Sequence, residues 1–457
     1  MLGTSQRPLR VAIIGAGPSG FYAAETLLGG SATAEVEMFD YLPAPFGLVR
    51  YGVAPDHPKI KNVIKIYEKV AAHPKFFFLG NVKVGRQLSV EELRRFYDVV
   101  IFTCGAQTDR KMGIPGEELP GSHTAIEFVA WYNGHPDYAQ RQFDLSQEIA
   151  VVIGQGNVAM DVSRILSKST DELRKTDMAA HALEALSQSK VKEVHVIGRR
   201  GPVQAAFTSP EIKEVGELSD CDVRVSPDDL VLNPESQKEL EDPNFSLRRK
   251  NFEILTNLSQ RPLTGKPKRF ILRFYESPVE IKGRGKVEEL VLEKNILVGQ
   301  PGSQQAKGTG EVSSLFCGLI FRSVRYRGVP IDGIPFDEKK GIFVNREGRI
   351  DLNGKPCSGF YCSGWIKRGP SGVIGTNKSD SDATVQKVWQ DLPQLNPCPE
   401  PSRNALLDLL KNRGVRVVSF SDWKKIDAAE IARGEKIGKP REKFVNINEM
   451  LAVLGKN

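Results

Sequence analysis

The sequence lacks any apolar run long enough to cross a lipid bilayer. A membrane-spanning helix needs about 20 consecutive apolar residues. The longest stretches here, such as residues 11–15 and 99–104, are far shorter. The few residues before the first predicted strand are too short for a signal or transit peptide. We therefore expect a soluble protein whose targeting segment was either removed or never present.

Cysteine is scarce and never occurs in a CxxC pair. The six cysteines are Cys104, Cys221, Cys317, Cys357, Cys362 and Cys398. Without closely spaced pairs, neither a disulfide framework nor a metal site is indicated, and a reducing compartment is favoured. Cys357 and Cys362 are the nearest pair, and two unrelated thiols beside a strand are a better interpretation of them than a redox-active pair.

Charge of one sign is in only slight excess. The net charge of +7 permits nucleic acid, an anionic membrane or an acidic protein as partner, but most basic residues lie among acidic ones. No zinc-finger or basic-zipper spacing is present, so nucleic-acid binding is not expected. Hydrophobic residues at 40% and charged residues at 26% are ordinary for globular proteins. The 457 residues predict two or three domains at roughly 150 residues each.

The first motif is a glycine turn between a strand and a helix. A β-branched run at residues 10–15 leads into Gly15-Ala16-Gly17-Pro18-Ser19-Gly20, and a helical pattern follows at residues 21–28. In GxGxxG spacing the first glycine makes the tight turn, the second lets a pyrophosphate approach, and the third lets helix pack on strand. The next predicted strand, residues 36–39, ends at Asp40, whose carboxylate would accept hydrogen bonds from a ribose. A glycine-rich turn without a ligand is the alternative.

A second unit of the same kind begins at residue 149. A strand at residues 149–154 leads into Gly154-Gln155-Gly156-Asn157-Val158-Ala159, a GxGxxA turn, and then into a helix. The following strand, residues 191–197, ends in Gly198-Arg199-Arg200 rather than in an acid. Two arginines there would bind a 2′-phosphate, so this turn predicts NADP rather than NAD. A surface arginine pair without a ligand is the alternative.

Two such turns predict an α/β protein with two Rossmann-like lobes that hold two different dinucleotides. A tightly held flavin and an exchangeable nicotinamide are one pair that fits. Because side chains cannot carry hydride, the redox centre must be a cofactor. A third cluster, residues 359–376 (GFYCSGWIKRGPSGVIGT), combines a strand with glycines that would let a flat ligand approach. Its Trp365 is suited either to covering an aromatic ring or to a place in the core.

The segment from residue 221 to residue 314 is expected to be the least regular. It is charged and rich in Pro, Gly and Gln, which indicates irregular, antiparallel structure with strands at residues 269–275 and 288–293. Its tip, residues 299–310, is expected to be mobile. Toward the C-terminus a helix is predicted at residues 423–433, after Ser421-Asp422, with Gly434 at its end.

Four longer segments are specific enough to indicate a family. They are residues 45–58 (PFGLVRYGVAPDHP), 198–208 (GRRGPVQAAFT), 361–376 and 419–443 (SFSDWKKIDAAEIARGEKIGKPREK). The chain resembles adrenodoxin reductase, the mitochondrial-type ferredoxin–NADP reductase family, from about Arg10 to the C-terminus. This resemblance implies glutathione-reductase-like flavoprotein architecture. An FAD-binding domain, residues 1–106 and 331–457, would be interrupted by an NADP-binding domain, residues 107–330.

The resemblance also implies which residues contact each cofactor. FAD would contact the turn residues Gly15, Gly17, Ser19 and Gly20, together with Asp40, Leu48, Val84, Trp365, Gly372, Val373 and Ile374. NADP would contact Gln155, Gly156, Asn157, Val158, Arg199, Arg200, Glu211 and Gly372. Relatives often have Glu in place of Asp40, and the shorter acid can still reach a ribose.

The reaction implied is hydride transfer from NADPH to FAD near Gly372, followed by release of single electrons to an acidic [2Fe-2S] ferredoxin or adrenodoxin. His57, in a Pro-Asp-His-Pro turn, and Asp161 are candidates for handling protons, although His57 fits a structural turn residue equally well. Because charge steers weak electron-transfer partners, the acceptor should dock on basic residues. The candidates for this docking are Lys213, Arg248, Arg249 and Lys250.

Other classes share parts of this pattern. A pyridine-nucleotide disulfide reductase has both lobes but needs a redox cysteine pair beside the flavin, and none is visible. Flavin monooxygenases fit the fold, but residues 45–58 argue against them. A non-enzymatic, NADP-sensing flavoprotein would bind the nucleotides without reducing a ferredoxin. The resemblance also implies a monomer in the mitochondrial matrix, or in the cytoplasm of a bacterium.

Overall fold

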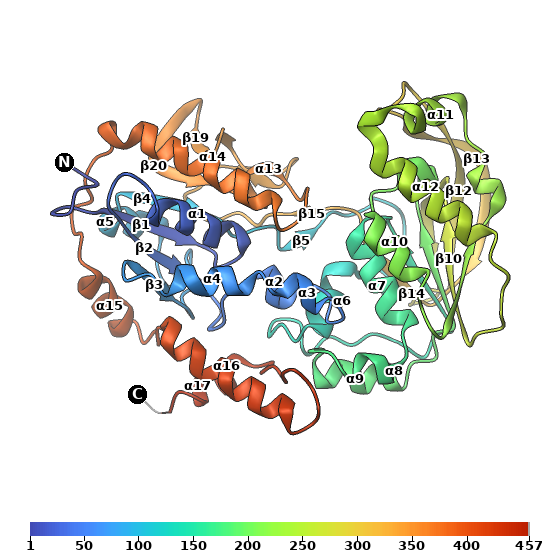
Figure 1. Ribbon diagram of the computed structural model, residues 1–457, viewed down its shortest axis with the longest axis horizontal. Helices are drawn as coiled ribbons and strands as arrows, with labels where there is room; N and C mark the ends of the chain where they lie inside the picture. Colours follow the sequence, from blue (N-terminus) through green and yellow to red (C-terminus); the bar gives the residue numbers. More distant parts are fainter. Residues whose placement is uncertain (456–457) are drawn as a thin grey trace. The chain divides into compact units, whose positions relative to one another are not determined.

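The computed structural model describes residues 1–455, which form two compact units (Figure 1). The first unit comprises Met1–Val53, His57–Arg110 and Arg325–Asn457, and the second comprises Ala54–Asp56 and Lys111–Val324. Apart from Ala54–Asp56, these bounds lie within a few residues of the predicted domain boundaries. The assignment of one cofactor to each domain stays a prediction. No helix of the described residues is long and apolar enough to cross a membrane.

The first unit is built on a seven-stranded sheet in the order β18-β19-β20-β4-β1-β2-β3. The strands are β1 (Leu9–Ile14), β2 (Ala34–Phe39), β3 (Phe76–Leu79), β4 (Val99–Phe102), β18 (Asn345–Arg346), β19 (Arg349–Leu352) and β20 (Lys355–Cys362). Strands β20, β4, β1, β2 and β3 run parallel, whereas β18 and β19 pair antiparallel at one edge. Since β1 lies between β2 and β4, the first glycine turn leaves the carboxyl end of a central strand, where α/β sheets bind ligands.

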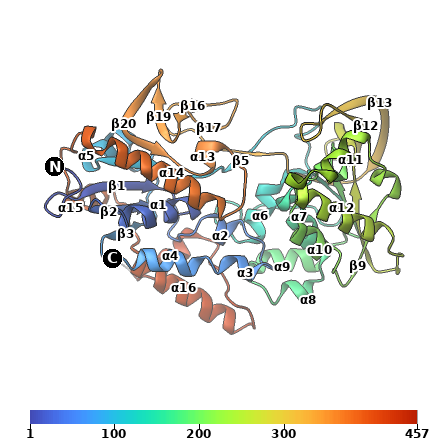
Figure 2. The same cartoon turned by 45° about the horizontal axis from the view of Figure 1, so that its top comes forward.

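Helices cover both faces of this sheet, which explains the continuous apolar run in β1. Val11 and Ile13 pack against α1, α4, α14 and α16, whereas Ala12 and Ile14 pack against α5 and α15. Helices α1 and α14 lie side by side in both views (Figures 1 and 2). The helices are α1 (Pro18–Leu28), α2 (Leu48–Tyr51), α3 (Pro58–Lys61), α4 (Ile64–Ala71), α5 (Val90–Phe96), α13 (Trp365–Arg368), α14 (Thr376–Asp391), α15 (Arg403–Asn412), α16 (Phe420–Glu435) and α17 (Ile447–Ala452). Two short ladders, β5 (Thr108–Asp109) with β15 (Tyr326–Arg327) and β16 (Phe336–Asp337) with β17 (Ile342–Phe343), complete the unit.

The second unit is built on a parallel six-stranded sheet in the order β6-β14-β7-β8-β10-β9. The strands are β6 (Ser122–Thr124), β7 (Ile149–Ile153), β8 (Glu193–Ile197), β9 (Cys221–Val225), β10 (Lys268–Arg273) and β14 (Leu319–Arg322). One face, with Ala150 and Val152, packs against helices. These helices are α6 (Ala125–Tyr132), α7 (Asn157–Ser167), α8 (Thr170–Leu173), α9 (Ala180–Ser187), α10 (Ser209–Val215) and α12 (Ser246–Ser259), and α11 (Pro234–Glu241) packs on α12. The other face, with Val151 and Ile153, packs against an antiparallel sheet of β11 (Glu276–Lys282), β12 (Glu289–Val298) and β13 (Gln305–Phe316).

The segment from residue 221 to residue 314 is more regular than predicted. It begins with β9, continues into α11 and α12 and returns to the parallel sheet at β10. The strand predicted at residues 269–275 is therefore parallel, and only the part from β11 onward is antiparallel. The second half of the tip, residues 299–310, belongs to β13, and its mobility stays a prediction. A buried carboxylate binds the first half of the tip, because Glu239 accepts hydrogen bonds from the Gly302 amide at 2.8 Å and from Gln304 Nε2 at 2.9 Å.

Helix α16 also differs from its predicted limits. It begins at Phe420, after Ser419, whose hydroxyl accepts a hydrogen bond from the Asp422 amide at 3.2 Å in a capping box. Gly434 lies inside the helix rather than at its end. A Cβ on Gly434 would lie 2.4 Å from the Cα of Arg441, so glycine is required here for the close passage of the following chain.

Candidate functional site

The first glycine turn (residues 15–20) joins β1 to α1 and gives each glycine a separate role. Gly15 has a φ of +114°, and a Cβ there would lie 2.7 Å from the carbonyl oxygen of Thr103. A Cβ on Gly20 would lie 2.3 Å from the carbonyl oxygen of Gly15, so only glycine lets α1 approach the turn this closely. A Cβ on Gly17 would meet nothing within 4 Å. The turn is therefore open at Gly17, which fits the approach of a pyrophosphate.

Asp40 follows β2 and is bonded to this turn. Its Oδ2 accepts a hydrogen bond from the Ala16 amide at 3.0 Å, and its Oδ1 accepts one from the Leu42 amide at 3.0 Å. Burial raises the pKa of Asp40 to about 6, although these amides favour the ionised form. A carboxylate has about four acceptor positions, so Asp40 keeps capacity for a ribose hydroxyl.

Ser19 lies in the first turn of α1 with its side chain buried. Its hydroxyl donates to Ser363 at 2.9 Å and lies 3.0 Å from the hydroxyl of Ser381. The first amides of any helix have no intrahelical acceptors, and in α1 no side chain caps them. Because the hydroxyl of Ser19 is committed to other serines, a phosphate would meet its amide and the positive end of the helix dipole instead.

Trp365 is half-buried and is not a core tryptophan. Its ring stacks on Tyr326 with 5.8 Å between centroids, and its Nε1 donates to the Ser371 carbonyl at 3.3 Å. The turn that follows is exposed, and Gly372 has a φ of +79°. The other predicted flavin contacts of this unit are Leu48 (42% exposed), Val84 (half-buried), Val373 (57% exposed) and Ile374 (half-buried).

The second glycine turn (residues 154–159) joins β7 to α7 and repeats this geometry. Gly154 has a φ of +122°, and a Cβ there would lie 2.4 Å from the carbonyl oxygen of Ser323. A Cβ on Gly156 would meet nothing within 4 Å, so this turn is also open at its second glycine. Ala159 takes the third position and is fully buried. The second unit thus offers a phosphate the same backbone cradle as the first.

Gln155 and Asn157 hold the second turn to neighbouring segments. Gln155 Nε2 donates to the Arg273 carbonyl at 2.9 Å, and the backbone carbonyl of Gln155 accepts from the Ala206 amide at 3.0 Å. Asn157 Oδ1 accepts from the Thr208 amide at 2.9 Å. Val158 is half-buried against the helical core. Through these bonds the turn is fixed to residues 205–208, directly after the arginine loop.

Arg199 and Arg200 follow β8 at the surface, Arg199 exposed and Arg200 half-buried. Their carbonyls are fixed, since Arg199 accepts from Asn295 Nδ2 at 2.9 Å and Arg200 accepts from the Tyr275 amide at 3.1 Å. The backbone of this loop is therefore held, and the two arginines follow the carboxyl end of β8, which pairs with β7, the strand that leads into the open turn. Asp40 occupies the corresponding place in the first unit, with the opposite charge.

A buried arginine joins two of the predicted residues in the second unit. The Arg164 side chain is 1% exposed and contacts Asp56 at 2.7 Å, Asp161 at 2.6 Å and Glu211 at 3.0 Å. Burial would lower the pKa of Arg164, but the three carboxylates outweigh it and raise that pKa. Burial would likewise raise the pKa of Asp56, but Arg164, followed by Lys168, lowers it well below its usual range. Arg164 therefore favours the ionised form of Asp56.

Sequence reasoning named Asp161 and Glu211 but missed Arg164 and Asp56. The spacing of Asp161 and Arg164, three residues apart on one predicted helix, was the available signal. His57 immediately follows Asp56 in the chain and is the residue before α3. The ion pairs of Asp56 thus fix the residue next to His57, which is the other proton-handling candidate.

The four predicted docking residues are not equivalent. Lys213 and Lys250 are exposed, and Lys213 has only a loose contact with Glu217 at 3.8 Å. Arg248 forms an ion pair with the buried Glu239. Arg249 Nε donates to the Leu240 carbonyl at 2.7 Å. Lys213 and Lys250 are therefore better placed than Arg248 to meet a partner, because Arg248 also anchors α12.

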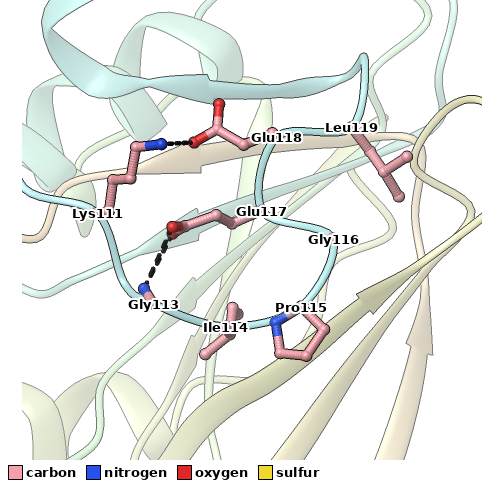
Figure 3. Close-up of a pocket in the computed structure, with 8 residues that line it drawn as sticks. All are labelled: Lys111, Gly113, Ile114, Pro115, Gly116, Glu117, Glu118 and Leu119. Atoms are coloured by element: carbon pink, nitrogen blue, oxygen red, sulfur yellow. Dashed lines mark hydrogen bonds and ion pairs between the residues drawn. The ribbon is translucent and has the colours of Figure 1, made fainter.

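Two other features lie outside the predicted site. A surface hollow is formed by residues 111–119, with a Lys111–Glu118 ion pair of 2.8 Å and a Gly113 amide that donates to Glu117 at 3.2 Å (Figure 3). It contains none of the predicted cofactor residues. All six cysteines are free, and burial raises the pKa of Cys104 and of Cys317 to about 12. These two thiols are therefore poor nucleophiles.

Two Rossmann-like lobes with two glycine turns define the class of the protein as an α/β oxidoreductase that binds dinucleotides. Residues 9–218 match the family described as pyridine nucleotide-disulphide oxidoreductase. The solved structure of Mycobacterium tuberculosis FprA in complex with NADPH superposes with a TM-score of 0.92 at 45% sequence identity, and covers 98% of this chain and 100% of that one.

Curated relatives identify the family more narrowly. NADPH-ferredoxin reductase FprA of Mycobacterium tuberculosis is 45% identical, over 98% of this chain and 99% of its own length. The mitochondrial NADPH:adrenodoxin oxidoreductase of Homo sapiens is 43% identical, over 99% of this chain and 93% of its own. The chain belongs to the family of NADPH-ferredoxin and NADPH:adrenodoxin reductases, and it is an oxidoreductase. The resemblance inferred from the sequence is confirmed.

Proposed function

We propose that this chain takes a hydride from NADPH onto FAD and passes the electrons one at a time to an acidic [2Fe-2S] ferredoxin or adrenodoxin. One observation carries the proposal: two glycine turns of the same geometry are each open at the second glycine, and the strands that follow end in opposite charges. An acid suits a ribose diol, and an arginine pair suits a 2′-phosphate.

The first unit would hold FAD. Its pyrophosphate would lie at Gly17, against the amides of the first turn of α1, and its ribose would donate to Asp40. Trp365, Leu48 and the turn at Gly372 would contact the flat ring. When bound, FAD would supply both hydride acceptance and single-electron release, which no side chain can provide. The chain's own part is to bind and orient.

The second unit would hold NADPH. Gly156 and the first turn of α7 would meet the pyrophosphate, while Arg199 and Arg200 would bind the 2′-phosphate. Gln155 and Asn157 would act mainly by fixing this turn, since their side chains already bond the segments that follow β8 and β10. These bonds preorganise the turn before the nucleotide arrives.

The Arg164 cluster limits how protons would be handled. Arg164 forms ion pairs with Asp161, Asp56 and Glu211, so the carboxylate of Asp161 is already engaged with a cation. Asp161 would therefore orient and stabilise a neighbouring cation rather than donate a proton. His57, whose chain neighbour Asp56 is fixed by Arg164, is the better candidate for proton transfer.

The acceptor would dock through Lys213 and Lys250, with Arg249 beside them. We further propose that the enzyme acts as a monomer in the mitochondrial matrix, or in the cytoplasm if the source is bacterial. The relatives include mitochondrial and mycobacterial proteins, which supports both compartments. The slight positive net charge of the chain suits an acidic partner.

The decisive experiment is anaerobic addition of NADPH to the purified yellow protein, followed by a plant-type or adrenodoxin-type ferredoxin. We expect the flavin to bleach and the ferredoxin to be reduced at a rate that falls with salt. Lys213→Ala combined with Lys250→Ala should raise the ferredoxin KM and leave reduction of a small artificial oxidant intact. Lys411→Ala, an exposed lysine on α15 of the first unit, is the matched control. Binding of NADPH without bleaching would favour the sensing alternative.

A further inference from the structure

The segment between β2 and α2 has a strained backbone at one residue. Phe46 is a buried non-glycine residue with a φ of +84°, and Gly47 has a φ of +46°. Glycine adopts positive φ freely, but for Phe46 such a conformation costs free energy and persists only where the surroundings impose it. Strain of this kind concentrates at functional sites.

Phe46 and Gly47 lie directly against the first glycine turn. The Phe46 amide donates to the Ala16 carbonyl at 2.7 Å. A Cβ added to Gly47 would lie 3.0 Å from the Cα of Gly17, the open glycine of the turn. The next residue is Leu48, a predicted flavin contact. Any shift of residues 46–48 would therefore move backbone that borders the pyrophosphate position.

Helix α16, almost 400 residues later, supplies the surroundings. The Phe46 ring lies 6.4 Å from that of Phe420 and 6.1 Å from that of Trp423, both edge-on and both on α16. Its other ring neighbours are Phe21 of α1 at 5.5 Å and Tyr67 of α4 at 6.2 Å. Edge-on aromatic pairs fix ring position more strictly than aliphatic contacts do.

A buried ion pair completes the attachment. Arg50 of α2 contacts Glu430 of α16 through two parallel bonds, of 2.9 Å and 2.5 Å, and both side chains are at most 3% exposed. The Arg50 guanidinium also lies 4.9 Å from the Trp423 ring centroid. Beyond the helix, the Phe444 amide donates to Glu430 at 3.0 Å. The arginine side chain thus joins α2 to α16 by charge, geometry and stacking at once.

Stability alone does not account for this ion pair. Burying two charges costs free energy that their attraction often does not recover, so apolar side chains would hold two helices together as well. A bidentate pair adds one thing that apolar packing lacks, which is a unique orientation of the two partners. Orientation matters at Arg50 because the strained Phe46 precedes it by about one turn.

We propose that Glu430 is a positioning residue for the flavin. It acts through Arg50 to hold residues 46–50 of this chain against the first glycine turn, so that α16 sets the shape of the FAD pyrophosphate site without touching it. This inference rests on the proposed function, in which FAD binds at that turn.

The test compares FAD retention in Glu430→Gln with that in a matched variant, Asp98→Asn. Asp98 is also fully buried in the first unit, pairs with Arg7 through bonds of 2.9 Å and 2.8 Å, and accepts from a backbone amide, Cys398, at 2.8 Å. It precedes β4 and accepts from the Arg10 amide at 2.8 Å, at the amino ends of β4 and β1, whereas the glycine turn lies at the carboxyl end of β1. Removing its charge should destabilise the same unit without disturbing the pyrophosphate site.

We expect Glu430→Gln to weaken FAD affinity at least tenfold, to change the visible circular dichroism of the bound flavin, and to speed amide hydrogen exchange at residues 46–53. The KM for NADPH should stay within twofold, because α16 and α2 belong to the first unit. Asp98→Asn should lower Tm yet keep FAD affinity within twofold. Equal losses of FAD affinity in the two variants, or an unchanged affinity in Glu430→Gln, would overturn the proposal.

A milder variant keeps the test decisive if Glu430→Gln does not fold. Arg50→Lys keeps the positive charge but loses the bidentate contact, and we expect a three- to tenfold loss of FAD affinity with the same change in circular dichroism. Unchanged flavin binding in Arg50→Lys would also overturn the proposal. Failure of the proposed function looks different, since the unmodified protein itself would then bind no FAD.

Discussion

The two glycine turns share one backbone and differ in the side chains around it. Gly15 and Gly154 have φ values of +114° and +122°, and both turns are open at the second glycine. In the first unit the acid at the end of the second strand is bonded into the turn, whereas in the second unit the arginines lie at the surface. The backbone thus makes a dinucleotide site. We propose that the side chains at the strand end determine which nucleotide each turn accepts.

The largest expected effect comes from blocking the open side of each glycine turn separately. Gly17 has a φ of −92° and Gly156 a φ of −98°, values that valine tolerates, and an added Cβ meets no protein atom. Gly17→Val should therefore fold but lose FAD by at least about 100-fold, equivalent to about 2.7 kcal/mol. Gly156→Val should remain yellow and lose NADPH affinity by a similar factor. Flavin absorbance after gel filtration and NADPH titration measure the two losses.

A control separates a blocked ligand from a broken turn. Gly20→Ala places a Cβ 2.3 Å from the Gly15 carbonyl oxygen, so it should lower Tm as well as remove FAD. Gly17→Val should leave the Tm of the flavin-free protein nearly unchanged. If Gly17→Val retained its flavin at full occupancy, the pyrophosphate would not lie at this turn.

The next effect addresses the opposite charges. Replacing Arg199 and Arg200 by alanine removes hydrogen bonds to a 2′-phosphate, each worth about 1.5–3 kcal/mol when charged. We expect the KM for NADPH to rise about 10- to 100-fold per arginine. The kcat, the bound flavin and the KM for NADH should stay within about twofold, because the backbone of this loop is held by Asn295 and Tyr275. Equal changes for NADPH and NADH would show that the arginines do not read the 2′-phosphate.

Much of this comparison could be predicted from the sequence, because it depends on local pattern. Residues 11–15 and 149–154 are apolar and end in glycine, which predicts a strand and a turn, and the structure has β1 and β7 there. The glycine positions that require φ > 0 or close approach follow from the motif spacing alone. The charged residues after β2 and β8 can likewise be predicted from the sequence that directly follows each strand.

Contacts between distant segments could not be predicted this way. Arg164 meets Asp56 and Glu211 across 108 and 47 residues, and no local pattern specifies those pairs. The helix α12 was missed for another reason: its buried Asn251, Leu255 and Leu258 have helical spacing, but the charged composition of the segment hid it. Composition indicated irregular structure where periodicity indicated a helix.

A moderate effect concerns pH: the contribution of Asp40 to stability and that of Asp56 depend on pH in opposite directions. The pKa of Asp40 is raised to about 6 in the folded protein, above about 3.9 when unfolded, so its contribution to stability is present below pH 4 and is lost as pH rises through 6. Its ionised form accepts from ribose, so the FAD dissociation constant should rise about tenfold from pH 7 to pH 5. The lowered pKa of Asp56 has the reverse consequence, since its stabilisation of the second unit is lost in acid, below about pH 4.

Asp40→Asn is the control for this pH dependence, because an amide does not titrate. Its FAD affinity should be weaker at pH 7 but constant between pH 7 and pH 5, measured by flavin fluorescence on release. The NADPH dissociation constant should not follow the same curve. An unchanged pH dependence in Asp40→Asn would assign the titration to another group.

The smallest effect concerns the third glycine position of the motif, where the second turn has alanine instead. Ala159 stands where the first turn has Gly20, and it is fully buried in α7. Ala159→Gly makes the second turn GxGxxG and removes a helical, buried methyl group, which should cost about 1 kcal/mol and lower Tm by about 2–4 °C. NADPH affinity should change less than about twofold, because the open side at Gly156 is untouched. A large loss of NADPH affinity in this variant would mean that the third position shapes the phosphate cradle itself, rather than only the packing of helix on strand.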